Sequence, residues 1–196
     1  MGKNFSCNNS NGTRKKSDFY ETPYSITSSF LEREKFDYSL SILEPACGNN
    51  AIVKILENYW DKDNIIANDL FGNGKDFLSE TDNYSYIITN PPFSLAQEFI
   101  LKAKEIAINK FCFLLPLSYL HGKKRFDTIW SDNTFPLSKI YVYTRYPLLG
   151  EILRDDGKYH TGMMVYAWYV WDKEYLGPPI IDWIDNNEYI LKKGEK

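Results

Sequence analysis

The chain has 196 residues with 23 basic and 26 acidic side chains, and its net charge of -3 excludes a polybasic nucleic-acid coat or an acidic tail protein. A hydrophobic fraction of 43% and an aromatic fraction of 16% can fill a core, and a chain of this length usually forms one domain. No apolar stretch reaches the roughly 18 residues that cross a bilayer, and the N-terminus lacks the apolar core of a secretory signal, so we expect a cytoplasmic protein.

Residues 1–17 are polar and rich in Asn and Ser, with Lys3, Arg14, Lys15 and Lys16 and no acid. Such a segment buries too little apolar surface to offset its ordering entropy. We therefore expect a disordered basic tail, followed by a single catalytic domain over residues 18–196.

Short apolar runs then alternate with helix-length segments. The pattern predicts strands at residues 41–44, 64–69, 86–89 and 111–115, and helices at residues 51–59 and 95–108. The strands are apolar on both faces, and the second helix places Phe99, Ala103, Ile106 and Ala107 at helical spacing. This combination indicates a Rossmann-like α/β fold, with a mostly parallel sheet covered by helices on both faces.

The alternation changes after Lys123, where a short helix is predicted to end near Trp130. Residues 139–144 and 163–171 are predicted strands with no helix-length segment between them, so we expect them to pair antiparallel. The aromatic side chains of residues 166–171 are expected to lie in the core.

The cysteines and histidines indicate neither a disulfide framework nor a metal site. Cys7, Cys47 and Cys112 are far apart, as expected in a reducing compartment. His121 and His160 are not spaced against further metal ligands, and no serine-hydrolase elbow is present. We expect no bound metal.

The first candidate site motif, Glu44-Pro45-Ala46-Cys47-Gly48, lies where the first strand ends. A turn of small residues there lets a ligand approach the backbone, although an ordinary strand-to-helix turn has the same composition. Asp69 ends the next strand 21 positions after Gly48, where a carboxylate can hold ribose hydroxyls. The sequence Gly72-Asn73-Gly74 is predicted to be a plain turn.

The second motif is Asn90-Pro91-Pro92-Phe93, directly after a predicted strand. Two prolines could simply end the strand. An amide, a stiff backbone and an aromatic ring at a sheet edge also form a receptor for a planar ring that carries an amino group. The Asn90 oxygen and the Pro91 carbonyl can accept its two hydrogens while Phe93 stacks on the ring.

Together with Asp18-Phe19-Tyr20-Glu21-Thr22-Pro23, these motifs resemble the S-adenosylmethionine-dependent DNA adenine N6-methyltransferases, especially small phage or prophage forms. The resemblance implies a class I methyltransferase fold, with a seven-stranded sheet and a late antiparallel strand. It also implies S-adenosylmethionine as the cofactor and DNA as the partner. The cofactor-binding residues that it implies are Tyr20, Thr22, Pro23, Glu44, Ala46, Cys47, Gly48, Asp69, Leu70, Asp76, Phe77 and Asn90.

Within that set the resemblance assigns the methionine part to Tyr20, Thr22, Pro23 and residues 44–48. It assigns the ribose to Asp69, and the cofactor adenine to Asp76 and Phe77. The expected catalytic residues are Asn90, Pro91, Pro92 and Phe93. Positioning of the amine would supply the catalysis, without a general base.

A target base in duplex DNA must be flipped out of the stack before it can react. Phe93 would stack on one face of the flipped base, and Tyr146 is the candidate for the other. Lys123 and Arg125, and the connection 145–162 with Arg145, Arg154, Lys158 and His160, are candidates for phosphate and base contacts. A solvated charged face explains the Lys-Lys-Arg run equally well.

Two features depart from the family's usual pattern. Asn50 stands where a second glycine is usual, but Asn tolerates a left-handed backbone, so we expect the turn to persist. No segment is long enough for a separate target-recognition domain, so loops, a second copy of the chain or another partner would have to supply recognition.

Three alternatives share part of the pattern. An RNA adenine N6-methyltransferase or a protein glutamine methyltransferase would use the same Asn-Pro-Pro-aromatic chemistry. A non-catalytic module with a methyltransferase fold would instead bind nucleic acid or a partner.

Overall fold

The computed structural model describes residues 21–144, 165–186 and 189. The expected basic tail, residues 1–17, lies outside the described residues. The α-helices and strands are α1 (Tyr24–Arg33), β1 (Ile42–Glu44), α2 (Val53–Leu56), β2 (Ile65–Ala67), β3 (Tyr84–Thr89), α3 (Ala96–Ile106), β4 (Ala107–Pro116), α4 (Lys123–Arg125), β5 (Leu137–Tyr143), β6 (Tyr166–Asp172) and β7 (Ile180–Ile184). Single helical turns are η1 (Lys62–Asn64), η2 (Phe77–Ser79), η3 (Phe93–Leu95), η4 (Leu117–Leu120) and η5 (Phe126–Trp130).

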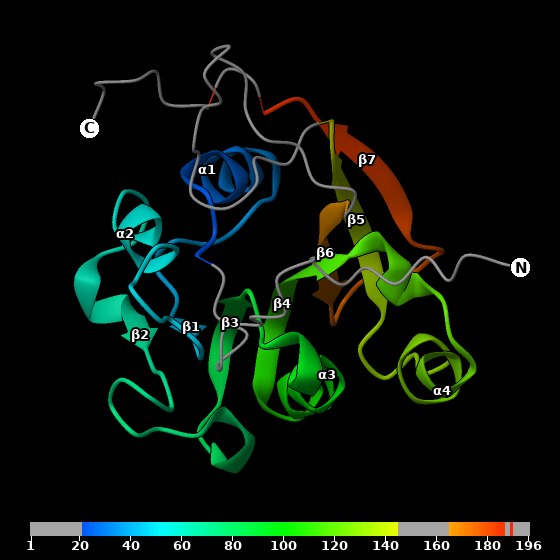
Figure 1. Ribbon diagram of the computed structural model, residues 1–196, viewed down its shortest axis with the longest axis horizontal. Helices are drawn as coiled ribbons and strands as arrows, with labels where there is room; N and C mark the ends of the chain where they lie inside the picture. Colours follow the sequence, from blue (N-terminus) through cyan, green and yellow to red (C-terminus); the bar gives the residue numbers. More distant parts are fainter. Residues whose placement is uncertain (1–20, 145–164, 187–188, 190–196) are drawn as a thin grey trace, which may run out of the picture.

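The strands form one seven-stranded sheet in the order β2-β1-β3-β4-β6-β5-β7 (Figure 1). Strands β2, β1, β3 and β4 are parallel, β6 runs antiparallel to both β4 and β5, and β7 is parallel to β5. The predicted mostly parallel sheet with a late antiparallel strand is therefore confirmed. The antiparallel pairing predicted between the strand near residues 139–144 and the strand ending near residue 171 is confirmed as well.

Helices cover both faces of the sheet, as the sequence predicts (Figure 1). On one face α1 and α2 contribute Ile26, Phe30 and Ile55 to a core cluster, and on the other α3 contributes Phe99 and Ile100 to a second cluster. The central strands are buried on both faces, including every residue of β1. Their continuous apolar runs follow from this double coverage.

Some predicted boundaries are wrong. Regular helix spans only Val53–Leu56 of the predicted 51–59, and the predicted helix 95–108 ends at Ile106. Ala107 has extended backbone angles and pairs with Tyr84 at the start of β4. Helix α3 therefore ends at Ile106, although the apolar pattern continues, because Ala107 pairs with the neighbouring strand.

Helix α1 and strand β7 were not predicted from the sequence. The α1 sequence YSITSSFLER is rich in hydroxyl and β-branched residues, which have low helix propensity. Burial stabilises this helix instead, because Phe30 stacks on Trp168 with ring centroids 4.7 Å apart. Two side chains of the sheet, Tyr143 Oη and Trp168 Nε1, also donate hydrogen bonds to the Ile26 carbonyl.

Among the described residues, no helix is both long enough and apolar enough to cross a membrane.

Candidate active site

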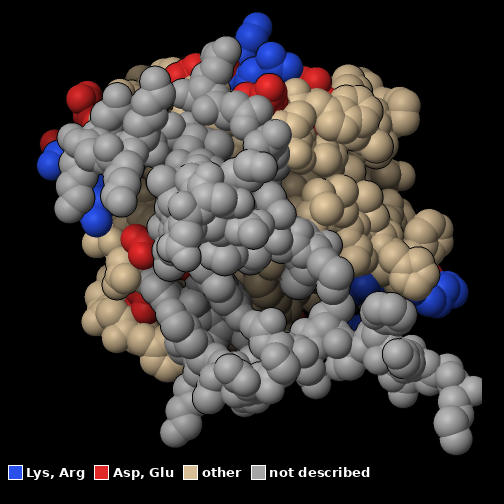
Figure 2. All heavy atoms as spheres, turned by 45° about the horizontal axis from the view of Figure 1, so that its top comes forward, with Lys and Arg blue, Asp and Glu red and all other residues tan. Residues whose placement is uncertain are grey.

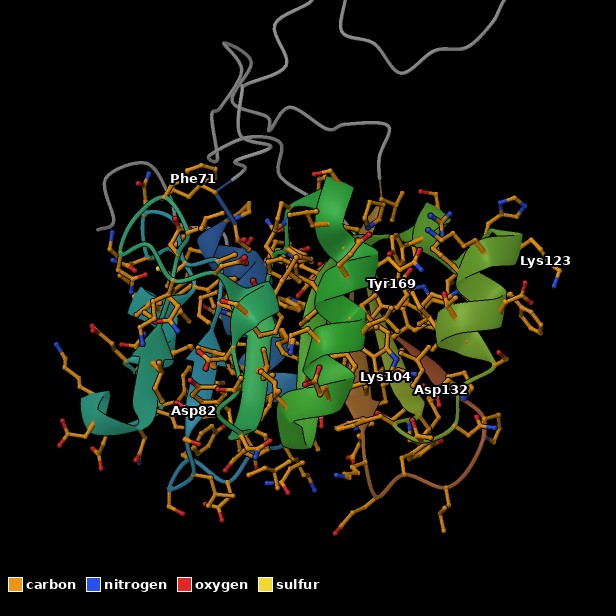
Figure 3. The ribbon with its side chains drawn as sticks, turned by 90° about the horizontal axis from the view of Figure 1, so that it is seen from below. Phe71, Asp82, Lys104, Lys123, Asp132 and Tyr169 are labelled. Atoms are coloured by element: carbon orange, nitrogen blue, oxygen red, sulfur yellow. The ribbon has the colours of Figure 1, made fainter. Side chains whose placement is uncertain are left out.

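The candidate residues gather at one edge of the sheet because β1, β2 and β3 are parallel. Glu44 ends β1 opposite Ala67, the last residue of β2, and Thr89 ends β3. The carboxyl ends of these strands are therefore side by side, as in other open α/β sheets that bind ligands. In Figure 3 Phe71 lies at this edge, and Asp82, which precedes β3, lies at the opposite edge.

Glu44 is fully buried at this edge. Its Oε1 atom accepts hydrogen bonds from the Thr89 hydroxyl at 2.6 Å and from the Ala46 backbone N–H at 3.0 Å. Its buried Oε2 atom has no hydrogen-bond partner in the described part of the chain. Burial, with a smaller contribution from the charge of Asp69, raises the pKa of Glu44 to about 8. A cationic donor placed at Oε2 would therefore stabilise the ionised form.

The turn after Glu44 has the backbone that the sequence predicts. Gly48 and Asn50 both have left-handed backbone, with φ of 49° and 63°. Asn50 therefore adopts the conformation for which glycine is usual, and its carbonyl accepts the Lys54 N–H, which begins the turns that lead into α2. Burial raises the pKa of the Cys47 thiol to about 11. At neutral pH this thiol stays protonated and is a poor nucleophile.

Asp69 connects the loops that follow β1 and β2. Its Oδ2 atom accepts the Gly48 N–H at 3.0 Å, and its Oδ1 atom accepts the N–H groups of Phe71 and Gly72. A carboxylate has about four acceptor positions, so a position on Oδ2 remains for a ligand hydroxyl after these bonds are counted. Residues 70–73 form a turn that includes Gly72 and Asn73, as the sequence predicts, and the Gly74 N–H donates to the Asp69 carbonyl.

The remaining predicted cofactor residues on this side differ in exposure. Leu70 is half exposed, and the Asp76 carboxylate caps a helical turn by accepting the Leu78 N–H. Phe77 is buried and packs against Phe99 of α3, so its ring belongs to the core.

Asn90 lies just beyond β3 and is half-buried. Its Nδ2 atom donates a hydrogen bond to Thr22 Oγ1 at 3.1 Å. Thr22 is buried and precedes α1, so the resemblance-derived residues Thr22 and Pro23 do lie beside the Asn-Pro-Pro-Phe turn. Pro91 is buried at this turn, where it contributes a fixed φ and no N–H donor.

Phe93 meets an aromatic partner that sequence reasoning missed. Its ring stacks on Tyr166, with centroids 5.7 Å apart and an interplanar angle of 29°. Trp168, Tyr169 and Trp171 are fully buried, as expected, whereas Tyr166 is partly buried and packs against the core cluster that contains Trp168. Because β6 is antiparallel, its first residue returns to the carboxyl edge opposite Pro116. The antiparallel direction predicted for this strand was the signal that could have placed Tyr166 at the carboxyl edge.

The predicted basic residues Lys123 and Arg125 lie on α4. Lys123 pairs with Asp127 at 2.5 Å, and the Arg125 guanidinium donates to the His121 carbonyl and covers the Tyr119 ring at 4.6 Å. Lys123 points outward in Figure 3. On the face shown in Figure 2, basic side chains lie in separate groups near the border of the view rather than in one continuous patch.

Several predicted residues lie outside the described residues: Tyr20, Tyr146, Arg145, Arg154, Lys158 and His160. Within the described residues, no group of His, Cys, Asp and Glu side chains could hold a metal ion.

Known structures share the fold of this chain. No protein-family model and no curated protein sequence matches the chain. A modification subunit of a putative type I restriction enzyme from Vibrio vulnificus superimposes with a TM-score of 0.57 at 14% identity, over 87% of this chain and 48% of that chain. The methyltransferase subunit of a type I restriction-modification system from Streptococcus thermophilus gives 0.54 at 12% identity, over 90% of this chain and 49% of that one.

A predicted O-methyltransferase from Agrobacterium tumefaciens gives a TM-score of 0.51 at 10% identity, over 82% of this chain and 84% of that chain. The chain has the Rossmann-like fold of methyltransferases. It spans about half the length of the two restriction-system subunits. At these identities the likeness concerns the fold alone.

Proposed function

We propose that this protein transfers a methyl group from S-adenosylmethionine to the exocyclic N6 amine of adenine in DNA. The observation that carries the proposal is the position of Asn90, at the carboxyl edge of the sheet and directly after Thr89, whose hydroxyl donates to the buried Glu44 carboxylate. Two solved structures with this fold are described as modification or methyltransferase subunits of type I restriction systems, which supports DNA as the substrate.

The residues at the edge fit the cofactor. The unpartnered buried Oε2 of Glu44 suits the methionine ammonium, because a charge-assisted hydrogen bond would satisfy it. The remaining acceptor position on Asp69 Oδ2 suits a ribose hydroxyl. The turn from Ala46 to Gly48 offers backbone without bulky side chains between these two carboxylates. When bound, the cofactor supplies an electrophilic methyl group on a sulfonium.

Asn90 and Pro91 suit the exocyclic amine of the target adenine. The lone pair of an adenine amine is delocalised into the ring, so the amine is a weak nucleophile. The Asn90 Oδ1 and the Pro91 carbonyl would accept its two hydrogens and orient the lone pair. Transfer would form the bond from the amine nitrogen to the methyl carbon as the carbon–sulfur bond breaks, and the resulting ammonium would lose a proton to solvent. Asn90 is neutral and no general base is required.

The aromatic pair Phe93 and Tyr166 suits the flipped base. The rings already stack on each other, and separation of the rings, or displacement of one, would present a π-face to adenine. Tyr166 thereby takes the role that the sequence suggested for Tyr146. Lys123 and Arg125 on α4 remain candidates for phosphate contacts, and loops or a partner would supply the target specificity.

The test is transfer of labelled methyl groups to unmethylated genomic DNA, total RNA and a protein lysate in parallel, followed by mass spectrometry of the products. N6-methyladenine in DNA alone is expected. Label in RNA, or in glutamine of a protein, would show that this molecule, and not DNA, is the substrate. Asn90→Ala should lower the rate by about 100-fold or more. Asn58→Ala, at an exposed amide beyond α2, is the matched control and should keep the wild-type rate.

A further inference from the structure

The Asn90 amide is held from a second segment of the chain. Its Nδ2 atom donates to Thr22 Oγ1 at 3.1 Å, across 68 positions of sequence. An amide has one acceptor oxygen and a nitrogen that only donates, on opposite branches of the same planar group. A bond from Nδ2 to Thr22 therefore turns Oδ1 away from Thr22.

Thr22 is buried next to α1, a helix that is packed against the sheet. It is only 5% exposed and lies two positions before α1. That helix is tied to the sheet through the Ile26 carbonyl, which accepts from both Tyr143 Oη and Trp168 Nε1. The stack of Phe30 on Trp168 adds a buried contact in the same place. Thr22 is thus fixed relative to β5 and β6, strands on the other side of β4 from Asn90.

We infer that Thr22 is a positioning residue that sets the orientation of the Asn90 amide for methyl transfer. The inference rests on the proposed function, in which Oδ1 accepts a hydrogen of the target amine. It differs from the role in cofactor binding that the resemblance implies for Thr22. A positioning role predicts a loss of rate at saturating cofactor, whereas a role in binding predicts a loss of cofactor affinity.

Thr22→Val removes the hydroxyl and keeps the shape of the side chain. We expect a single-turnover rate about 10- to 100-fold lower on DNA, because small misplacements of a reacting pair cost factors of this size. The dissociation constant for S-adenosylmethionine, from calorimetry, should stay within about threefold of the wild type. Thr22→Ser retains the hydroxyl and should restore most of the rate.

Thr27→Val is the matched control. Thr27 is also a buried threonine, on α1, but its Oγ1 has no hydrogen-bond partner among the residues that the structure describes. This variant should keep the wild-type rate and cofactor affinity. Equal loss of rate in Thr22→Val and Thr27→Val would identify a general effect on α1 and would overturn the inference.

Two further results would overturn it. One is a wild-type rate in Thr22→Val. The other is a rate loss that saturating cofactor fully restores, which would make Thr22 a cofactor ligand instead. The contact itself is read without activity, from exchange of the Asn90 side-chain NH₂ protons in nitrogen-15 NMR spectra of the full chain. Exchange should be at least about tenfold faster in Thr22→Val, since the hydrogen bond that protects one proton is gone.

The NMR readout separates failure of the inference from failure of the proposed function. If the wild-type protein methylates no substrate, the proposed function fails and the positioning role fails with it, even when exchange verifies the contact. If the wild type methylates DNA and exchange is equal in both proteins, only the inference fails.

Discussion

Glu44 and Thr89 are joined across two parallel strands by a hydrogen bond of 2.6 Å from the threonine hydroxyl to Oε1, while the other oxygen of Glu44 is buried without a partner in the described part of the chain. The carboxyl group is therefore held in one orientation at the sheet edge. Its burial costs free energy whenever it is ionised, because half of its hydrogen-bonding capacity is unused.

The first prediction concerns the pH dependence of stability. Burial raises the pKa of Glu44 from an ordinary 4.5 to about 8, so the folded protein holds a proton that the unfolded chain releases. The free energy of unfolding should therefore fall as pH rises from about 4.5 to about 8. Glu44→Gln removes this ionisation and should be more stable than the wild type by a few kcal/mol at pH 8.5, since one pKa unit is worth about 1.4 kcal/mol.

Urea unfolding of both proteins at pH 4.5 and at pH 8.5 measures this difference. The two proteins should be nearly equally stable at the lower pH. A difference that does not change with pH would contradict the raised pKa. The same variant should bind S-adenosylmethionine about 10- to 100-fold more weakly by calorimetry, because glutamine cannot pair with the ammonium as a charge. Stability and affinity should thus change in opposite directions.

The second prediction concerns the pair Phe93 and Tyr166. Tyr166→Ala removes one face of the proposed base site, and base–aromatic stacking is worth about 1–3 kcal/mol. The KM for DNA should rise by about 10-fold or more, with the affinity for S-adenosylmethionine unchanged. Tyr166→Phe keeps the ring and should restore most of the loss. If the alanine variant has the wild-type KM, Tyr166 is only a packing partner of Phe93.

The third prediction concerns Glu34, a buried carboxylate near the opposite edge of the sheet. Its oxygens accept from Lys110 at 2.7 Å and from Lys139 and Tyr141 at 2.9 Å. Burial raises its pKa, but the hydrogen bonds from Lys110 and Lys139 outweigh burial, and the pKa is lowered overall. The folded state therefore favours the ionised form. Its stabilisation is present above the ordinary pKa and is lost as pH falls through the lowered one.

Glu34→Gln should lower the free energy of unfolding by about 1–3 kcal/mol at pH 7, because two partly buried lysines lose a charged partner. The deficit should shrink below about pH 4. Methyl transfer and cofactor affinity should stay at wild-type values, since the site lies at the other edge of the sheet. A large drop in affinity in a folded Glu34→Gln protein would contradict this separation of stability from binding.

Local patterns were sufficient for much of the fold and part of the site. Strands that are apolar on both faces predict a parallel sheet, and parallel strands bring their carboxyl ends to one edge. Glu44 ends such a strand, and Asp69 and Asn90 each follow one, so their proximity could be predicted without coordinates. The left-handed backbone of Asn50 was also predictable, because few other residue types tolerate that conformation.

Other elements were not predictable because their stability comes from distant parts of the chain. Helix α1 has a poor helix-forming sequence and depends on burial against Trp168. The end of α3 depends on pairing of Ala107 with β3. A local apolar pattern cannot report a contact with a strand that lies far away in sequence.

Residue types and their order along the chain are enough to predict which groups the sheet edge carries: a carboxylate, a small-residue turn, a second carboxylate and an amide followed by two prolines and a phenylalanine. How these groups are held depends on contacts between distant segments. Thr22 meets Asn90 because α1 packs on the sheet, and Tyr166 meets Phe93 because β6 runs antiparallel. Both pairs join segments that are remote in the chain, and their orientation follows from packing of the whole domain.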